Sequence, residues 1–104
     1  MISHKPGVRI GLCHWIVGHM AVIADQVYGA HDEFECVITS AMDGVHSVGS
    51  LHYSGQAIDL RLPNDRSKCG AIKLDLANRL GDDFDVVLEA DHLHLELQAK
   101  QPYR

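Results

Sequence analysis

The sequence predicts a small α+β domain in which an antiparallel sheet of about four strands packs against two main helices. Two stretches, 12–28 and 68–80, carry apolar residues at helical spacing, and four shorter stretches show the alternation or the β-branched content that is typical of strands. At 104 residues the chain is long enough for one hydrophobic core and too short for two. We therefore expect a single domain over residues 1–104.

The first predicted helix covers residues 12–28, and Gly29 is its expected C-terminal cap. We expect His14 and His19 on this helix to be structural or to face solvent. The apolar stripe expected to face the core consists of Trp15, Ile16 and Ile23.

The second predicted helix covers residues 68–80. Ser67 is a favourable N-cap residue, and Gly81 is placed to end the helix. Ile72, Leu76 and Leu80 share one face, which we expect to be buried.

Four strands are predicted, at residues 35–40, 57–62, 84–88 and 92–97. About three residues separate the last two strands, so they should form an antiparallel hairpin. The last strand alternates strictly: its histidines and Glu96 point one way and its leucines the other. Residues 1–11 are expected to form an irregular lead-in.

Composition excludes several classes of function. A formal net charge of −5 and the lack of a basic stretch argue against a nucleic-acid-binding protein. The apolar run at 12–24 is interrupted by His14, Gly18 and His19 and falls short of the 18 or more apolar residues that a membrane span needs, and we recognise no export signal. Three widely spaced cysteines form no CxxC pair. Eight histidines are many for this length, and they direct attention to metal chemistry.

Histidines and acids are grouped in two places. His52 and Asp59 flank Gly55, whose backbone freedom would let both side chains turn towards one point. About thirty residues later, the strand begins with His92 and His94. Two histidines and an aspartate are a ligand set for catalytic zinc, which keeps its fourth position for water. The nearby acids, Glu89 and Asp91, are candidate general bases.

Each of these residues also has an ordinary structural interpretation. His52 fits a loop histidine bonded to backbone groups, and Asp59 fits a partner for Arg61. His92 and His94 fit the polar face of a half-exposed antiparallel strand. Glu89 and Asp91 fit turn residues. The spacing alone leaves both interpretations open.

Residues 50–59, SLHYSGQAID, match every fixed position of the SxHxxGxAxD motif of the M15-type zinc peptidases. This group contains D-alanyl-D-alanine carboxypeptidases, phage L-alanyl-D-glutamate endopeptidases and the related zinc fold of the hedgehog signalling domain. Residues 91–96, DHLHLE, resemble the second motif of the family, an acid followed by a metal-binding histidine on a late strand. The stretch 39–47, which includes His46, is similar to small phage-associated members.

The resemblance implies a zinc ion held by His52, Asp59 and His94. It also implies that His92 assists by hydrogen bonding to the transition state. Ser50 and His46 would have supporting roles, with Ser50 orienting the loop or a ligand. The general base would be Asp91 or Glu89, and the phage endopeptidases favour Asp91.

One departure from the family pattern bears on specificity. Many carboxypeptidase members carry an arginine shortly before the first motif, where this chain has Met42-Asp43. Arg61 and Arg66 are the candidates to replace it. The departure favours an endopeptidase over a D,D-carboxypeptidase.

The resemblance therefore implies a zinc-dependent, phage-associated peptidase that cuts a stem or cross-bridge peptide of bacterial peptidoglycan. Without a signal peptide, the protein would be made in the cytoplasm and reach the cell wall after release or as part of a phage particle. No nucleic-acid or membrane partner is expected, and the oligomeric state stays undetermined. Two alternatives remain: a zinc-binding pseudoenzyme that serves as an interaction module, and a structural component of a phage particle.

Overall fold

The computed structural model describes residues 2–4, 15–42 and 57–98. These ranges form two α-helices, one short 3₁₀ helix and five strands. The order along the chain is β1 (Ile2–His4), α1 (Trp15–Ala30), β2 (Cys36–Met42), β3 (Ala57–Arg61), η1 (Arg66–Lys68), α2 (Cys69–Leu80), β4 (Phe84–Leu88) and β5 (His92–Leu97). Within these ranges, no helix is long and apolar enough to cross a bilayer.

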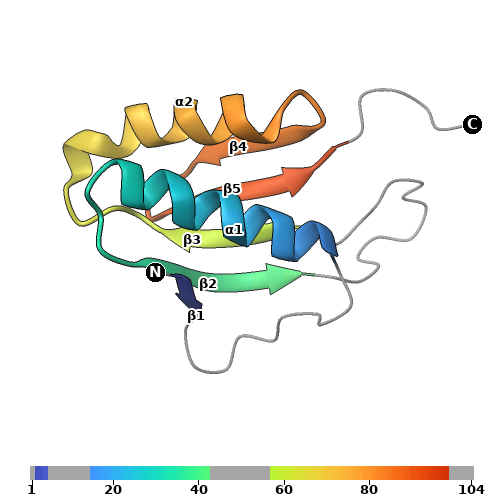
Figure 1. Ribbon diagram of the computed structural model, residues 1–104, viewed down its shortest axis with the longest axis horizontal. Helices are drawn as coiled ribbons and strands as arrows, with labels where there is room; N and C mark the ends of the chain where they lie inside the picture. Colours follow the sequence, from blue (N-terminus) through green and yellow to red (C-terminus); the bar gives the residue numbers. More distant parts are fainter. Residues whose placement is uncertain (1, 5–14, 43–56, 99–104) are drawn as a thin grey trace, which may run out of the picture.

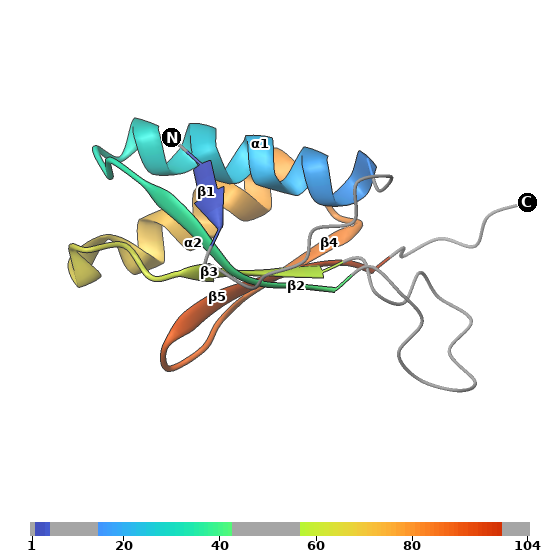
Figure 2. The same ribbon diagram turned by 90° about the horizontal axis from the view of Figure 1, so that it is seen from below.

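The strands form one mostly antiparallel sheet in the order β1-β2-β3-β5-β4. Both α-helices lie on the same side of it, so the domain has two layers (Figures 1 and 2). The predicted α+β class is confirmed, as is the hairpin of β4 and β5, whose bounds match the prediction.

The prediction of an irregular lead-in is wrong for Ile2–His4, which forms the fifth strand. It pairs in parallel with β2, from Ile2 opposite Cys36 to His4 opposite Ile38. Three residues are too few to show a period in the sequence, and what makes them a strand is a partner more than thirty residues away.

Helix α1 ends later than predicted, and Gly29 is not its cap. The helix continues to Ala30, and Asp32 takes the left-handed conformation with φ 63°. The Glu33 N–H donates to the Tyr28 carbonyl at 2.9 Å, and the Asp32 N–H donates to the Gly29 carbonyl at 3.1 Å. These two bonds form a Schellman motif, which normally places glycine where Asp32 stands.

The start of α2 also differs from the prediction, because Ser67 is not an N-cap. The cap residue is Asp65, whose carboxylate accepts hydrogen bonds from the Ser67 N–H at 3.0 Å and from the Ser67 hydroxyl at 2.6 Å. It caps the 3₁₀ turn η1, which leads directly into α2. The predicted end is confirmed, since Gly81 caps α2 with φ 94°.

The core lies between the sheet and the two helices. Leu60 of β3 and Leu93 and Leu95 of β5 are fully buried there. Each such leucine stabilises the fold by about 1.5–3 kcal/mol relative to an exposed one. The predicted helix stripe is confirmed in part, with Ile16 buried and Ile23 packed at the edge of the core. Because strand side chains alternate, the residues between these leucines lie on the sheet face turned away from the helices.

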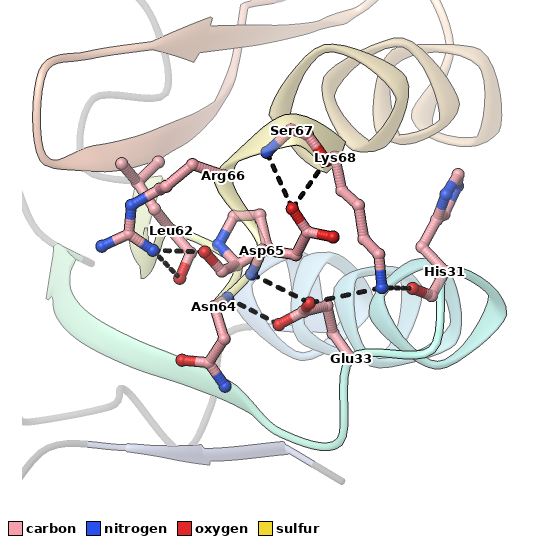
Figure 3. Close-up of polar contacts among 9 residues, drawn as sticks. His31, Glu33, Leu62, Asn64, Asp65, Arg66, Ser67 and Lys68 are labelled. Carbon is pink, nitrogen blue, oxygen red and sulfur yellow. Dashed lines mark hydrogen bonds and ion pairs between the residues drawn. The ribbon is translucent and has the colours of Figure 1, made fainter.

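A buried carboxylate ties the end of α1 to the connection between β3 and α2. Glu33 is only 6% exposed, and its carboxylate accepts N–H bonds from Asn64 at 2.6 Å and Asp65 at 3.3 Å (Figure 3). Lys68 Nζ lies 3.5 Å from the same carboxylate and donates to the His31 carbonyl at 2.7 Å. The contact fixes where the chain leaves β3.

Replacing Glu33 by alanine should lower the free energy of unfolding by about 2–4 kcal/mol, because two backbone N–H groups and an ammonium lose a buried acceptor. Denaturant unfolding of wild type and variant measures this difference. Glu35→Ala is the matched control, since that glutamate is exposed and bonds to Ser3 on the surface. An equal decrease in the free energy of unfolding in the two variants would contradict the role assigned to Glu33.

Candidate metal centre

The pairing of β3 with β5 brings the predicted site residues together. In this antiparallel register Asp59 lies directly opposite His94, and Arg61 lies opposite His92. Directly opposed residues project to the same side of a sheet, with Cβ atoms about 5 Å apart. Here that side is the face turned away from the helices.

Asp59, His92 and His94 form a compact group of potential ligands. Asp59 Oδ1 lies 2.6 Å from His94 Nδ1 and 3.7 Å from His92 Nε2. One ligand atom from each residue lies within 4.8 Å of the others, and this is the one group of its kind in the described ranges. The cluster can therefore hold a metal ion.

Each histidine also has an acid on its outer nitrogen. His94 Nε2 lies 2.9 Å from Glu96 Oε1, and His92 Nδ1 lies 2.6 Å from Asp91 Oδ1. Carboxylates in this position orient metal-binding histidines, because they accept the proton of the nitrogen that does not bind the metal. The two inner nitrogens are thereby left facing Asp59.

The site favours positive charge. The side chains of Asp59, His92 and His94 are between 25% and 30% exposed, so solvent screens them only in part. Burial lowers the pKa of His94, but its hydrogen bonds to Glu96 and Asp59 outweigh burial, and the net shift is upward. In physical terms, the carboxylates stabilise a cation at this position, whether it is a proton or a metal ion.

The donor set fits zinc in type and spacing. Imidazole nitrogens and a carboxylate oxygen are ordinary zinc ligands, with bonds of about 2.0–2.2 Å, which places ligand atoms about 3.3 Å apart in a tetrahedron. The observed separations of 2.6 and 3.7 Å lie on either side of that value. The same donors also suit other divalent transition metals, so the geometry does not identify the metal.

The predicted site residues divide into two sets. Asp59, His94 and His92 converge as described above, whereas His52, Ser50 and His46 lie outside the described residues. The third potential ligand in the described part is His92, the residue that the resemblance makes an assistant to catalysis.

The other predicted residues lie around this cluster. Asp91 is 87% exposed, and its hydrogen bond from His92 lowers its pKa, so it is ionised at neutral pH. Glu89 is exposed, and its backbone N–H closes the hairpin turn by donating to the His92 carbonyl at 2.8 Å. Arg61 is exposed, and its carbonyl accepts a 2.6 Å bond from the buried Tyr28 hydroxyl.

Sequence reasoning missed the roles of Glu96 and Gln98. Gln98 Nε2 donates to Glu96 Oε2, so Glu96 is held between Gln98 and His94. The signal was present in the sequence, because residues two apart on a strand share a face and Glu96 follows His94 at that spacing.

The two cysteines in the described ranges take no part in this centre. Cys36 and Cys69 are free thiols in the core. Burial, followed by the nearby Asp25 carboxylate, raises the pKa of Cys36 to about 12, which keeps this thiol protonated at neutral pH.

No protein-family model matches the chain, and no curated protein matches it. The motifs and the geometry of the cluster are therefore what point to a function.

Metal binding should stabilise the folded protein. At a free Zn²⁺ concentration of about 100 times the Kd, the gain is about 2.7 kcal/mol, equal to a rise in Tm of about 10 °C or more for a domain of this size. Thermal unfolding with added Zn²⁺ and with a chelator measures this rise. His94→Ala should abolish it, and His19→Ala, which changes an exposed histidine of α1, should keep it. A wild-type Tm that does not change when Zn²⁺ is added would contradict a metal centre.

Proposed function

We propose that the protein is a zinc-dependent peptidase that hydrolyses a peptide bond in bacterial peptidoglycan. The observation that carries the proposal is the convergence of Asp59, the last residue of the first motif, with His94 of the second motif, at 2.6 Å. Two segments that resemble the metal-binding motifs of one enzyme family thus meet at one point, and their donor atoms suit a metal.

The zinc ion would be held by Asp59 and His94 together with His52 from the first motif. A bound Zn²⁺ supplies Lewis acidity, which acidifies a water molecule and polarises the scissile carbonyl. Asp59 supplies the negative charge of the ligand set, and Glu96 holds His94 in the orientation that presents Nδ1. These contacts prepare the centre before substrate arrives.

His92 is suited to stabilise developing negative charge. Its Nε2 faces the cluster at 3.7 Å from Asp59 Oδ1, and its Nδ1 is bonded to Asp91. A protonated imidazole held in this way donates towards an oxyanion formed beside the cluster, an electrostatic contribution that is usually among the largest in acyl transfer. The contact with Asp91 fixes the orientation of the ring.

The general base is one of the two acids of the hairpin turn. Asp91 is ionised at neutral pH, and its hydrogen bond directs it towards His92. Glu89 lies two residues earlier in the same turn. Asp91 matches the base position of the phage endopeptidases that the motif resembles, and we assign it that role with Glu89 as the alternative.

The proposed activity predicts defined cleavage of muropeptides. Wild-type protein with Zn²⁺ should convert them to products whose masses identify one cut peptide bond. The double variant Asp91→Ala/Glu89→Ala should keep its zinc and lose turnover by about 10²–10⁴-fold, because a general base is removed. Mass spectrometry of the digest and elemental analysis of the protein measure both quantities. Zinc bound without any cleavage in the wild type would favour an interaction module instead.

The ligand set predicts opposite effects for two histidines. His52→Ala should remove zinc from the protein, whereas His92→Ala should keep zinc and lower kcat by about 10²–10³-fold, because an oxyanion donor is lost. Zinc content and steady-state kinetics on the two variants test this. The reverse pattern, with zinc lost in His92→Ala and retained in His52→Ala, would make His92 the third ligand and contradict the assignment from the resemblance.

A further inference from the structure

We infer that Glu96, held by Gln98, is a positioning residue for the metal centre, because it fixes which nitrogen of His94 faces Asp59. The inference rests on the metal centre of the proposed function and adds two residues to it. Neither residue contacts the reacting groups in this role, since Glu96 acts through His94 and Gln98 acts through Glu96.

The two ring nitrogens of His94 contact different carboxylates. Nδ1 lies 2.6 Å from Asp59 Oδ1, and Nε2 lies 2.9 Å from Glu96 Oε1. An ionised carboxylate only accepts hydrogen bonds, so the contact with Glu96 requires a proton on Nε2. In the metal-free protein the Asp59 carboxylate likewise accepts from Nδ1, so a metal ion in the cluster would replace the Nδ1 proton, while Nε2 keeps its own proton for Glu96. Glu96 therefore presents Nδ1 as the metal ligand beside Asp59.

The position of Glu96 is fixed from its other side. Its Oε2 accepts a hydrogen bond from Gln98 Nε2, while the Gln98 backbone N–H donates to the Asp83 carbonyl at 2.6 Å. Both oxygens of Glu96 are thus engaged, although its side chain is 34% exposed and has access to solvent. The two contacts therefore hold the Glu96 side chain in one orientation.

A freely rotating His94 would bind a metal less well. Without an acceptor at Nε2, the neutral ring distributes its proton between both nitrogens and its plane is less restrained. Metal binding would then have to select one tautomer and one orientation, and removing such outer partners typically costs 10–100-fold in metal affinity.

The test measures Zn²⁺ affinity by competition with a chromophoric chelator on the full chain. Glu96→Ala should weaken Zn²⁺ binding by about 10–100-fold. Glu96→Gln should recover most of the loss, since its amide oxygen accepts the Nε2 proton and the Gln98 amide can turn over to accept from its NH₂ group. Asp82→Asn, in the turn between α2 and β4, is an exposed acid outside the cluster and should leave the affinity unchanged.

The outcomes separate this inference from the proposed function. If the wild type binds zinc and Glu96→Ala binds it with unchanged affinity, the positioning role is overturned. The proposed peptidase function is not contradicted by that result. An equal loss in Glu96→Gln and Glu96→Ala also overturns it, because the charge and not the acceptor would then matter. Weakened Zn²⁺ binding in Glu96→Ala with rescue by glutamine, but no peptide cleavage by the wild type, supports the positioning role and overturns the peptidase.

Discussion

The register between β3 and β5 is the constraint on which the candidate site depends. Asp59 stands opposite His94 in this pairing, and the two strands keep Leu60 and Leu93 on the other face. A slip of one residue would turn Asp59 towards the core and bury a carboxylate among leucines, which is prohibitively costly without a partner. The leucines that fill the core therefore also place the side chains of the candidate metal site.

The rest of the domain holds this pair of strands in place from the side of the sheet that faces the helices. The buried Tyr28 hydroxyl donates to the Arg61 carbonyl at the end of β3, and Glu33 binds the backbone just beyond it. Burial, the largest effect, raises the pKa of Tyr28 well above its usual value, so this hydroxyl remains a donor at any ordinary pH. Helix α1 and the turn that follows it thus fix the end of β3 by direct polar contacts as well as by packing. The site is built on strands rather than loops, which gives its described residues a rigid support.

Charge balance explains why acids surround the two histidines. Asp59 lies between His92 and His94, while Asp91 and Glu96 take the outer nitrogens. Carboxylates this close to one another repel unless positive charge lies among them. Protonated imidazole can supply that charge, and so can a divalent cation, which would replace the proton between Asp59 and His94. The same arrangement that can hold a metal also orients the two imidazoles.

The sequence alone determined the α+β class, the bounds of β4 and β5, and the candidacy of Asp59, His92 and His94. Strict alternation in β5 made this possible, because a period of two specifies both the strand and its two faces. It missed β1, whose three residues carry no period. It also misplaced two caps, because more than one residue near each helix end suits a cap and the path of the chain decides between them. Only the tertiary structure decided that Asp59 meets His94 and that Glu96 holds His94 from the other side. Those contacts depend on the β3–β5 register, which joins residues about thirty-five positions apart, and no local pattern fixes a distance across that separation.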